Sequence, residues 1–227
     1  MEMKDYDSSI YEKMSVAVDL LVFTIENNRL KCLVVEREEE PFAGMVALPG
    51  VFVGIDETLE EATIRGIKEE TGLEGIYFEQ LYTFGAVKRD PRMRIISVSY
   101  MALVPFEKLK FKAGARSTDA FLIDVDELLA EDSDKKGIRN DFAFDHKDIL
   151  TYARQRLKNK VIYSKVAFHL VPKEFTLPEL QKVYEILLGR RLYKANFRKK
   201  IGPYIVETDK MTSGEAHRPS RLYRIQD

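Results

Sequence analysis

Two adjacent glutamates, Glu69 and Glu70, are the residues of this chain best suited to metal and phosphate chemistry. Carboxylate oxygens are the hard ligands that Mg²⁺ and Mn²⁺ prefer, and such a cation can hold a pyrophosphate. Both lie in residues 59–71, whose apolar spacing predicts a helix. At about 100° per residue, Gly66 falls on their arc and Ile64 falls on another side, which we expect to be core. A solvated glutamate pair that binds nothing has the same spacing, because charged runs usually face water.

Capping residues mark both ends of this predicted helix. Thr58 and Glu61 have the spacing of a capping box, in which each side chain accepts a hydrogen bond from the backbone of the other residue. Gly72 follows the last turn, where a left-handed residue commonly ends a helix. Since Leu-Pro-Gly at residues 48–50 comes before, the sequence predicts a glycine turn that leads into an acidic helix.

The segment resembles the Nudix box, which reads Gly, five residues, Glu, seven residues, then Arg-Glu-aliphatic-any-Glu-Glu-any-Gly-aliphatic. The matching positions are Glu57, Arg65, Ile67, Glu69, Glu70, Gly72 and Leu73. The resemblance implies an α+β Nudix fold, with a mixed β-sheet between helices. It also implies a remnant catalytic set of Glu57, Arg65, Glu69 and Glu70. Any Mg²⁺ or Mn²⁺ would bind at Glu69 and Glu70.

Two positions depart from the Nudix pattern. Val51 stands where the pattern opens with glycine, and Gly66 stands where a glutamate follows the arginine. In the family that glutamate is a metal ligand or the catalytic base, and glycine has no side chain that could bind a metal or accept a proton. We therefore expect hydrolysis to be weak or absent.

The composition is that of a globular protein. Its 227 residues are 45% hydrophobic and 32% charged, which is enough for one or two domains. Residues 1–14 lack the basic-then-apolar order of a signal peptide, and the apolar stretches are too short to span a bilayer. The single cysteine, Cys32, lies in an apolar run. We expect a buried thiol, a reducing compartment and a cytoplasmic protein without membrane contact.

Residues with β-branched and aromatic side chains predict a sheet followed by a helix. The strands are expected at residues 15–25, 30–36, 75–86, 93–104 and 120–125. The first two form a hairpin around Asn27-Asn28, a favourable tight-turn pair. Asp145 and Asp148 are expected to cap a helix that runs to about Leu157.

Three arginines, Arg89, Arg92 and Arg94, lie in or beside the loop between two of these strands. Guanidinium groups bind phosphate oxygens, so these side chains could clamp a phosphorylated ligand. An ordinary exposed hairpin tip explains them equally well, because surface arginines are common. The surrounding residues 84–100 resemble one branch of the Nudix superfamily, related to ADP-ribose-processing proteins. That resemblance implies a small phosphorylated or sugar ligand.

The charge changes sign along the chain. Residues 160–227 contain 14 Lys and Arg against 7 Asp and Glu, a net charge of +7, whereas residues 1–159 have a net charge of −8. Such asymmetry is expected when only one part of a protein binds a polyanion. We predict a Nudix domain at residues 1–159 and a winged helix-turn-helix domain at residues 160–227.

The basic part has the element order of a winged helix. A capping box at Thr176 and Glu179 starts one helix. A second, basic helix is expected at residues 194–201. Two strands, residues 205–211 and 221–225, would form the wing. A winged helix can place its second helix in the major groove of DNA.

Seven residues of the second helix and the wing are candidates for DNA contact: Lys194, Asn196, Arg198, Lys199, Lys200, Arg218 and Arg221. Asn196 and Arg198 could reach base edges while basic neighbours bind phosphates, and this contact requires no cofactor. A basic helical cap that binds no DNA is the alternative. The helix pair, the wing and the charge segregation together favour DNA binding.

The whole chain resembles the Nudix-related transcriptional regulators, which join a Nudix domain to a winged helix and include ADP-ribose- and sugar-responsive members. The resemblance is most specific at residues 175–181, 196–201 and 218–223. It implies a homodimer that senses ADP-ribose or a related nucleotide sugar or sugar and binds double-stranded DNA. The alternative is a Mg-dependent Nudix hydrolase that cleaves the pyrophosphate of ADP-ribose or a similar nucleoside diphosphate derivative. Gly66 argues against the enzyme, and the basic tail favours the regulator.

Overall fold

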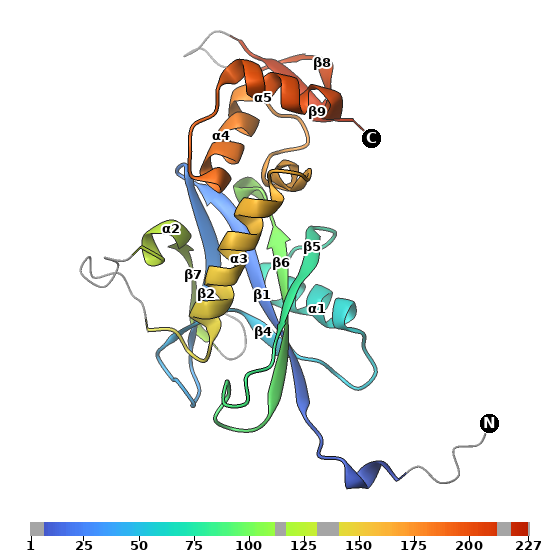
Figure 1. The fold of residues 1–227 in the computed structure, drawn as a ribbon, viewed down its shortest axis with the longest axis vertical. Coiled ribbons are helices and arrows are strands. Elements are labelled where there is room, and N and C mark those ends of the chain that lie inside the picture. Colours follow the sequence, from blue (N-terminus) through green and yellow to red (C-terminus); the bar gives the residue numbers. More distant parts are fainter. Residues whose placement is uncertain (1–6, 112–116, 131–140, 213–218, 227) are drawn as a thin grey trace, which may run out of the picture.

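The computed structural model describes residues 7–111, 117–130, 141–212 and 219–226 (Figure 1). Its strands are β1 (Ser15–Glu26), β2 (Arg29–Arg37), β3 (Val46–Ala47), β4 (Gly50–Phe52), β5 (Tyr77–Phe84), β6 (Ile95–Leu103), β7 (Ser117–Asp124), β8 (Ile205–Met211) and β9 (Arg221–Ile225). Its α-helices are α1 (Leu59–Thr71), α2 (Val125–Leu128), α3 (His146–Lys160), α4 (Leu177–Leu188) and α5 (Lys194–Ile201). Short 3-10 helices are η1 (Ser8–Ile10), η2 (Phe106–Lys108), η4 (Val166–Leu170) and η5 (Gly202–Tyr204).

The first seven strands form one mixed sheet. Its central path runs β3-β2-β1-β6-β5, while β4 pairs with β1 and β7 pairs with β2. The pairing of β1 with β6 is parallel, and the other pairings are antiparallel. The strands β8 and β9 form a separate two-stranded sheet.

Helices cover both faces of the large sheet, which explains the long apolar run of β1. Leu20 and Val22 point to the face that packs against α1 through Ile67. Leu21 and Phe23 point to the opposite face, where α3 lies across the sheet (Figure 1). Buried strands that are covered on two sides read as continuous apolar stretches, so the expected α+β architecture, a mixed sheet between helices, is confirmed.

Several local predictions are confirmed. Asn27 and Asn28 both have positive φ, 50° and 61°, as a tight hairpin turn requires. Helix α1 starts with the expected capping box and ends at Gly72 in the left-handed conformation. The prediction for Asp145 was wrong in its detail. Asp145 stands at the start of α3, but its side chain caps no helix N–H and instead binds Arg89. Ile64 was also misplaced, since it is 47% exposed.

The C-terminal elements have the expected order, with α4 and α5 followed by the β8–β9 hairpin, and they lie at the end of the molecule opposite the dark-blue η1 (Figure 1). They share one hydrophobic core with the sheet, because Leu157 of α3 and Leu180 of α4 belong to the same buried cluster as Phe23. The predicted boundary between residues 159 and 160 falls at the last turn of α3.

Contacts between side chains also fix α3 to its neighbours. Arg154 donates to the carboxylate of Asp126 and to the carbonyl oxygen of Leu187 near the C-terminal end of α4, at 2.8 Å. At the far end of α3, Lys160 pairs with Glu79 of β5. The ring of Tyr77 stacks on His169 at 3.9 Å between centroids. Across the described ranges, no helix has the length and apolar character needed to cross a membrane.

Candidate functional site

A cavity of about 370 Å³ opens where β1, β4, the start of α3 and the loop after residue 85 meet. Its lining is rich in charge. Among the residues that line it are Asp19, Arg37, Phe52, Arg65, Glu69, Glu70, Arg89, Asp90, Arg92, Phe144 and His146. The predicted Nudix helix and two of the three predicted arginines, Arg89 and Arg92, therefore meet at one cavity.

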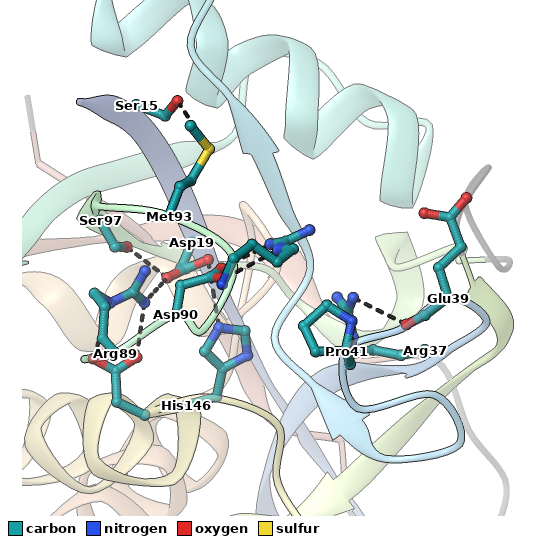
Figure 2. Close-up of polar contacts among 12 residues, drawn as sticks. Ser15, Asp19, Arg37, Glu39, Pro41, Arg89, Asp90, Met93, Ser97 and His146 are labelled. Carbon is teal, nitrogen blue, oxygen red and sulfur yellow. Dashed lines mark hydrogen bonds and ion pairs between the residues drawn. The ribbon is translucent and has the colours of Figure 1, made fainter. Parts of the chain in front are cut away.

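Asp19 is the centre of a buried polar network beneath this cavity (Figure 2). Its carboxylate accepts hydrogen bonds from Arg89 and from the hydroxyl of Ser97. The Nε2 atom of His146 lies 3.6 Å from Oδ1 of Asp19. Nδ1 of His146 accepts a hydrogen bond from the backbone N–H of Leu48 at 2.9 Å. Burial lowers the pKa of His146, so the ring is neutral near pH 7. Because Nδ1 accepts the N–H of Leu48, the proton of the neutral ring lies on Nε2.

Arg89 differs from its predicted role as a phosphate clamp. Its guanidinium binds both oxygens of Asp145 at 2.7 and 3.0 Å and also contacts Asp19 at 3.1 Å. Its side chain is only 4% exposed. Because two carboxylates already neutralise it, Arg89 is a structural ion-pair centre in the floor of the cavity.

Arg94 also differs from its prediction. Its two terminal nitrogens donate to the backbone carbonyl oxygens of Ala86 and Gly85, both at 2.8 Å. Arg94 is not among the residues that line the cavity. It holds the shape of the loop that carries Arg89 and Arg92.

Arg92 lies at the cavity, and its role in ligand contact stays a prediction. It lines the cavity, and its side chain is 38% exposed although it pairs with Asp90 at 2.7 Å. Its guanidinium lies 5.6 Å from the ring centre of Phe144, and that of Arg37 lies 4.9 Å from the same ring. Sequence reasoning missed Arg37 and Phe144, because they come from β2 and from the segment before α3. No local signal links those positions.

The remnant Nudix residues are largely occupied by one another. Arg65 donates to Glu57 through Nη2 at 2.6 Å and Nε at 3.1 Å, and to Glu69 at 3.4 Å. Oε1 of Glu57 also accepts the N–H of Gly54. Hydrogen bonds from Arg65 and Gly54 hold the pKa of Glu57 below its usual value, so this carboxylate is ionised and fixed as part of the turn.

Glu70 is different, because Oε2 of its carboxylate is buried and has no hydrogen-bond partner among the described residues. Burial, with a smaller contribution from Glu69, raises the pKa of Glu70. A cation beside it would relieve that cost. The other donors do not complete a site, since Glu57 is held by Arg65 and residue 66 has no side chain. Within the described ranges, no group of three or more His, Cys, Asp or Glu is arranged to hold a metal ion. The residues present do not fit a catalytic metal.

The two departures from the Nudix box lie against each other. A Cβ atom added to Gly66 would come within 2.9 Å of Leu20 Cδ1 and 3.3 Å of Val51 Cγ2. The side chain of Val51 thus occupies space beside position 66 that an opening glycine would leave empty. Gly66 is buried against the sheet, so the predicted acidic arc holds only Glu69 and Glu70.

The second candidate site is the exposed face of α5. Only Phe197 and Ile201 of this helix are buried, and Phe197 packs edge-on against Tyr184 of α4. The remaining predicted contacts of the helix are exposed: Lys194, Asn196, Arg198, Lys199 and Lys200. A basic helix presented in this way has the placement of a DNA recognition helix.

Three predicted DNA contacts have different outcomes. Lys200 turns back toward the protein, where its Nζ donates to the carbonyl oxygen of Ile162 and lies 5.2 Å from the ring centre of Tyr184. It joins α5 to its support, which differs from the predicted phosphate contact. Arg221 is half exposed on β9 and close to Glu207. Arg218 lies outside the described residues.

Comparison with known families and structures agrees with this two-part architecture. Residues 15–142 match the NUDIX domain, and residues 167–225 match the NrtR DNA-binding winged helix domain. The chain is 34% identical over 226 residues to the "ADPR responsive transcriptional repressor NtrR" of Acinetobacter baylyi, covering 98% of this chain and 86% of that protein.

Solved structures and a second curated relative extend the comparison. NrtR of Shewanella oneidensis, crystallised with a 27mer DNA, is 32% identical with a TM-score of 0.79 over 93% of each chain. Its NUDIX domain, crystallised with ADP ribose, aligns at 32% identity and TM-score 0.56, over 67% of this chain and 94% of that one. The ADP-ribose pyrophosphatase of Methanocaldococcus jannaschii is 39% identical over 136 residues, 59% of this chain and 76% of that protein.

The Nudix match covers more than half of the chain, and the similarity to the Acinetobacter repressor extends over nearly all of it. The chain therefore belongs to the NrtR-type branch of the Nudix superfamily, in which a Nudix domain is joined to a DNA-binding winged helix.

Proposed function

We propose that this protein is a transcriptional regulator whose Nudix domain binds ADP-ribose or a related nucleotide sugar and whose winged helix binds double-stranded DNA. The observation that carries the proposal is the exposed basic face of α5, attached to a Nudix domain that lacks the third helix carboxylate. The Acinetobacter and Shewanella relatives, by name and by crystallised ligand, support both halves of the proposal.

The cavity suits a nucleoside diphosphate sugar. Arg92, whose side chain is 38% exposed, presents N–H donors that match phosphate oxygens. Arg37 adds positive charge to the same cavity, while two of its nitrogens donate to the carbonyl oxygens of Glu39 and Pro41. Phe52 and Phe144 supply flat apolar surfaces for a base or a ribose. The glutamates on α1 lie at the same cavity. Glu70, whose Oε2 has no hydrogen-bond partner in the part of the chain that the structure describes, could hold Mg²⁺ or Mn²⁺ only together with ligand oxygens.

Helix α3 gives the cavity a rigid connection to the DNA-binding part. At the N-terminal end of α3, Phe144 and His146 line the cavity, and Asp145 between them binds Arg89. The helix has 15 residues and is about 22 Å long. Eight residues after His146, Arg154 binds the last turn of α4. A ligand that binds two placements of α3 unequally would shift the placement of α5.

We also propose that the Nudix domain ends near residue 159, where the winged helix domain begins, and that the protein forms a homodimer. Two winged helices related by a two-fold axis would bind two DNA half-sites, which gives more sequence specificity than one winged helix alone. Access to DNA and the buried thiol of Cys32 suit a cytoplasmic location.

Thermal unfolding with ADP-ribose tests the ligand half of the proposal. At 100 times its dissociation constant, a ligand of the native state adds about 2.7 kcal/mol of stability. We expect ADP-ribose to raise the melting temperature of the wild type, and Arg92→Ala to lose most of that rise. Arg156→Ala, on the exposed side of α3, serves as a charge-matched control and should respond as the wild type does. An equal rise in all three proteins would remove Arg92 from the site, and no rise in any would contradict ADP-ribose as the ligand.

A hydrolase is the second candidate function, because the similarity to the Methanocaldococcus pyrophosphatase covers the Nudix part. The packing around Gly66 argues against it. We expect Gly66→Glu alone to give no turnover of ADP-ribose with Mg²⁺ or Mn²⁺, and to lose about 1–3 kcal/mol of stability through overpacking against Leu20 and Val51. Adding Val51→Gly should recover part of that loss. Urea unfolding and product assays measure both effects. Turnover by the wild type at about 1 s⁻¹ or faster would instead establish the enzyme.

A further inference from the structure

Tyr193 is the most exposed aromatic residue of the described chain, with 83% of its surface accessible. It stands at the N-cap of α5, immediately before the first helical residue, Lys194. Its side chain makes no capping hydrogen bond. The ring is therefore presented to solvent at the end of the helix that is proposed to enter the DNA groove.

The backbone next to Tyr193 is nevertheless held in place. The N–H of Leu192 donates to Oε1 of Glu185 at 2.9 Å, and its carbonyl oxygen accepts from Nε2 of Gln181 at 3.0 Å. Both anchoring side chains belong to α4. These hydrogen bonds hold the backbone between the two helices, so the Cα atom of Tyr193 has a defined position. Less conformational entropy is therefore lost when its ring binds a partner.

Tyrosine at this position stabilises the start of α5 less than a capping residue would. Ser, Thr, Asp or Asn at an N-cap would accept a hydrogen bond from the first turn, which tyrosine does not do here. An exposed ring also buries little apolar surface. Residues that break a local rule without a structural gain are expected at functional sites.

The surroundings of Tyr193 indicate what the ring contacts. Arg190, Arg191 and Lys194 are all exposed beside it, so a single apolar ring lies among cations that attract phosphates. The N-terminal residues of a recognition helix contact base edges in the major groove, where the apolar feature is the C5-methyl group of thymine. Building on the proposed DNA binding, we infer that Tyr193 is a specificity-determining residue whose ring contacts a thymine methyl group.

Two variants and two DNA probes test this inference. The probes are a duplex selected from a random pool by the wild-type protein and the same duplex with uracil in place of thymine. We expect Tyr193→Ser to lower affinity for the selected duplex about tenfold, with little change for random DNA. Its melting temperature should stay the same or rise, because serine adds a cap. Tyr193→Phe should bind as the wild type does. Uracil should weaken the wild type and leave Tyr193→Ser unaffected.

Tyr11→Ser is the matched control, since Tyr11 is 59% exposed and directly follows η1, the dark-blue turn at the end of the molecule opposite α5 (Figure 1). It should bind both probes as the wild type does. Wild-type affinity in Tyr193→Ser, or an equal uracil penalty in both proteins, would overturn the inference. A loss in Tyr193→Phe equal to that in Tyr193→Ser would assign the contact to the hydroxyl group and overturn the methyl contact. If the wild type selected no duplex from the pool, the proposed DNA binding itself would fail.

Discussion

Replacing Arg198 with alanine is expected to remove most of the sequence discrimination of the protein. A bidentate arginine contact to a base contributes about 1–3 kcal/mol, which corresponds to about 5- to 150-fold in affinity for the preferred duplex. Affinity for random DNA should change much less. Arg198 is exposed on α5, one residue after the buried anchor Phe197. Binding titrations with a preferred and a random duplex measure the difference.

Lys199→Ala provides the contrast. Lys199 is exposed but can offer only a point charge to a phosphate, so its loss should weaken binding to all sequences alike. The slope of log affinity against log salt should fall by about one. Lys108→Ala removes the same charge from an exposed position within the Nudix match, outside the winged helix, and should change neither quantity. Equal, sequence-independent losses in Arg198→Ala and Lys199→Ala would argue against base readout.

Replacing Arg89 with alanine is expected to have the largest effect on stability. The change leaves the carboxylates of Asp19 and Asp145, which are 8% and 18% exposed, without their shared cation. Breaking a buried ion pair by removing one partner typically costs about 3–5 kcal/mol. Urea unfolding of the wild type and Arg89→Ala measures the loss.

Arg92→Ala is the matched control for this stability loss, because Arg92 lies in the same loop and pairs with a single carboxylate while its side chain is 38% exposed. Exposed ion pairs contribute about 0–1 kcal/mol. The two variants should therefore differ: Arg89→Ala should lose stability, whereas Arg92→Ala should keep its stability and lose ligand binding. A loss below about 1 kcal/mol in Arg89→Ala would show that the buried network is dispensable.

The elements that sequence predicted well are those with local signals. Both capping boxes, the Asn27-Asn28 turn and the strand pair β8–β9 depend on residues within a few positions of each other. Their physical cause is a backbone hydrogen bond or a backbone angle that particular side chains favour. The sequence therefore contains enough information to place the helix that borders the cavity and the helix proposed to contact DNA.

The candidate site was harder to predict because its contacts join distant residues. Asp19 and Arg89 are 70 positions apart, and Arg89 and Asp145 are 56 apart. The sequence of a basic loop does not reveal whether its arginines bind a phosphate or pair with buried carboxylates. The space beside Gly66 likewise depends on how closely α1 approaches β1, where Leu20 lies. Lys200 was assigned to DNA for the same reason, since its partner Ile162 is 38 positions away.

The most direct test of the account is a DNA titration with and without ligand. Purified protein would be titrated into a labelled duplex from its own upstream region, in the absence and presence of saturating ADP-ribose. We predict specific binding and a change in its dissociation constant of at least about fivefold when ADP-ribose is added, since allosteric coupling typically amounts to about 1–3 kcal/mol. Binding of the duplex with the same affinity in both conditions, while ADP-ribose still raised the melting temperature, would contradict the claim that the Nudix domain controls the winged helix.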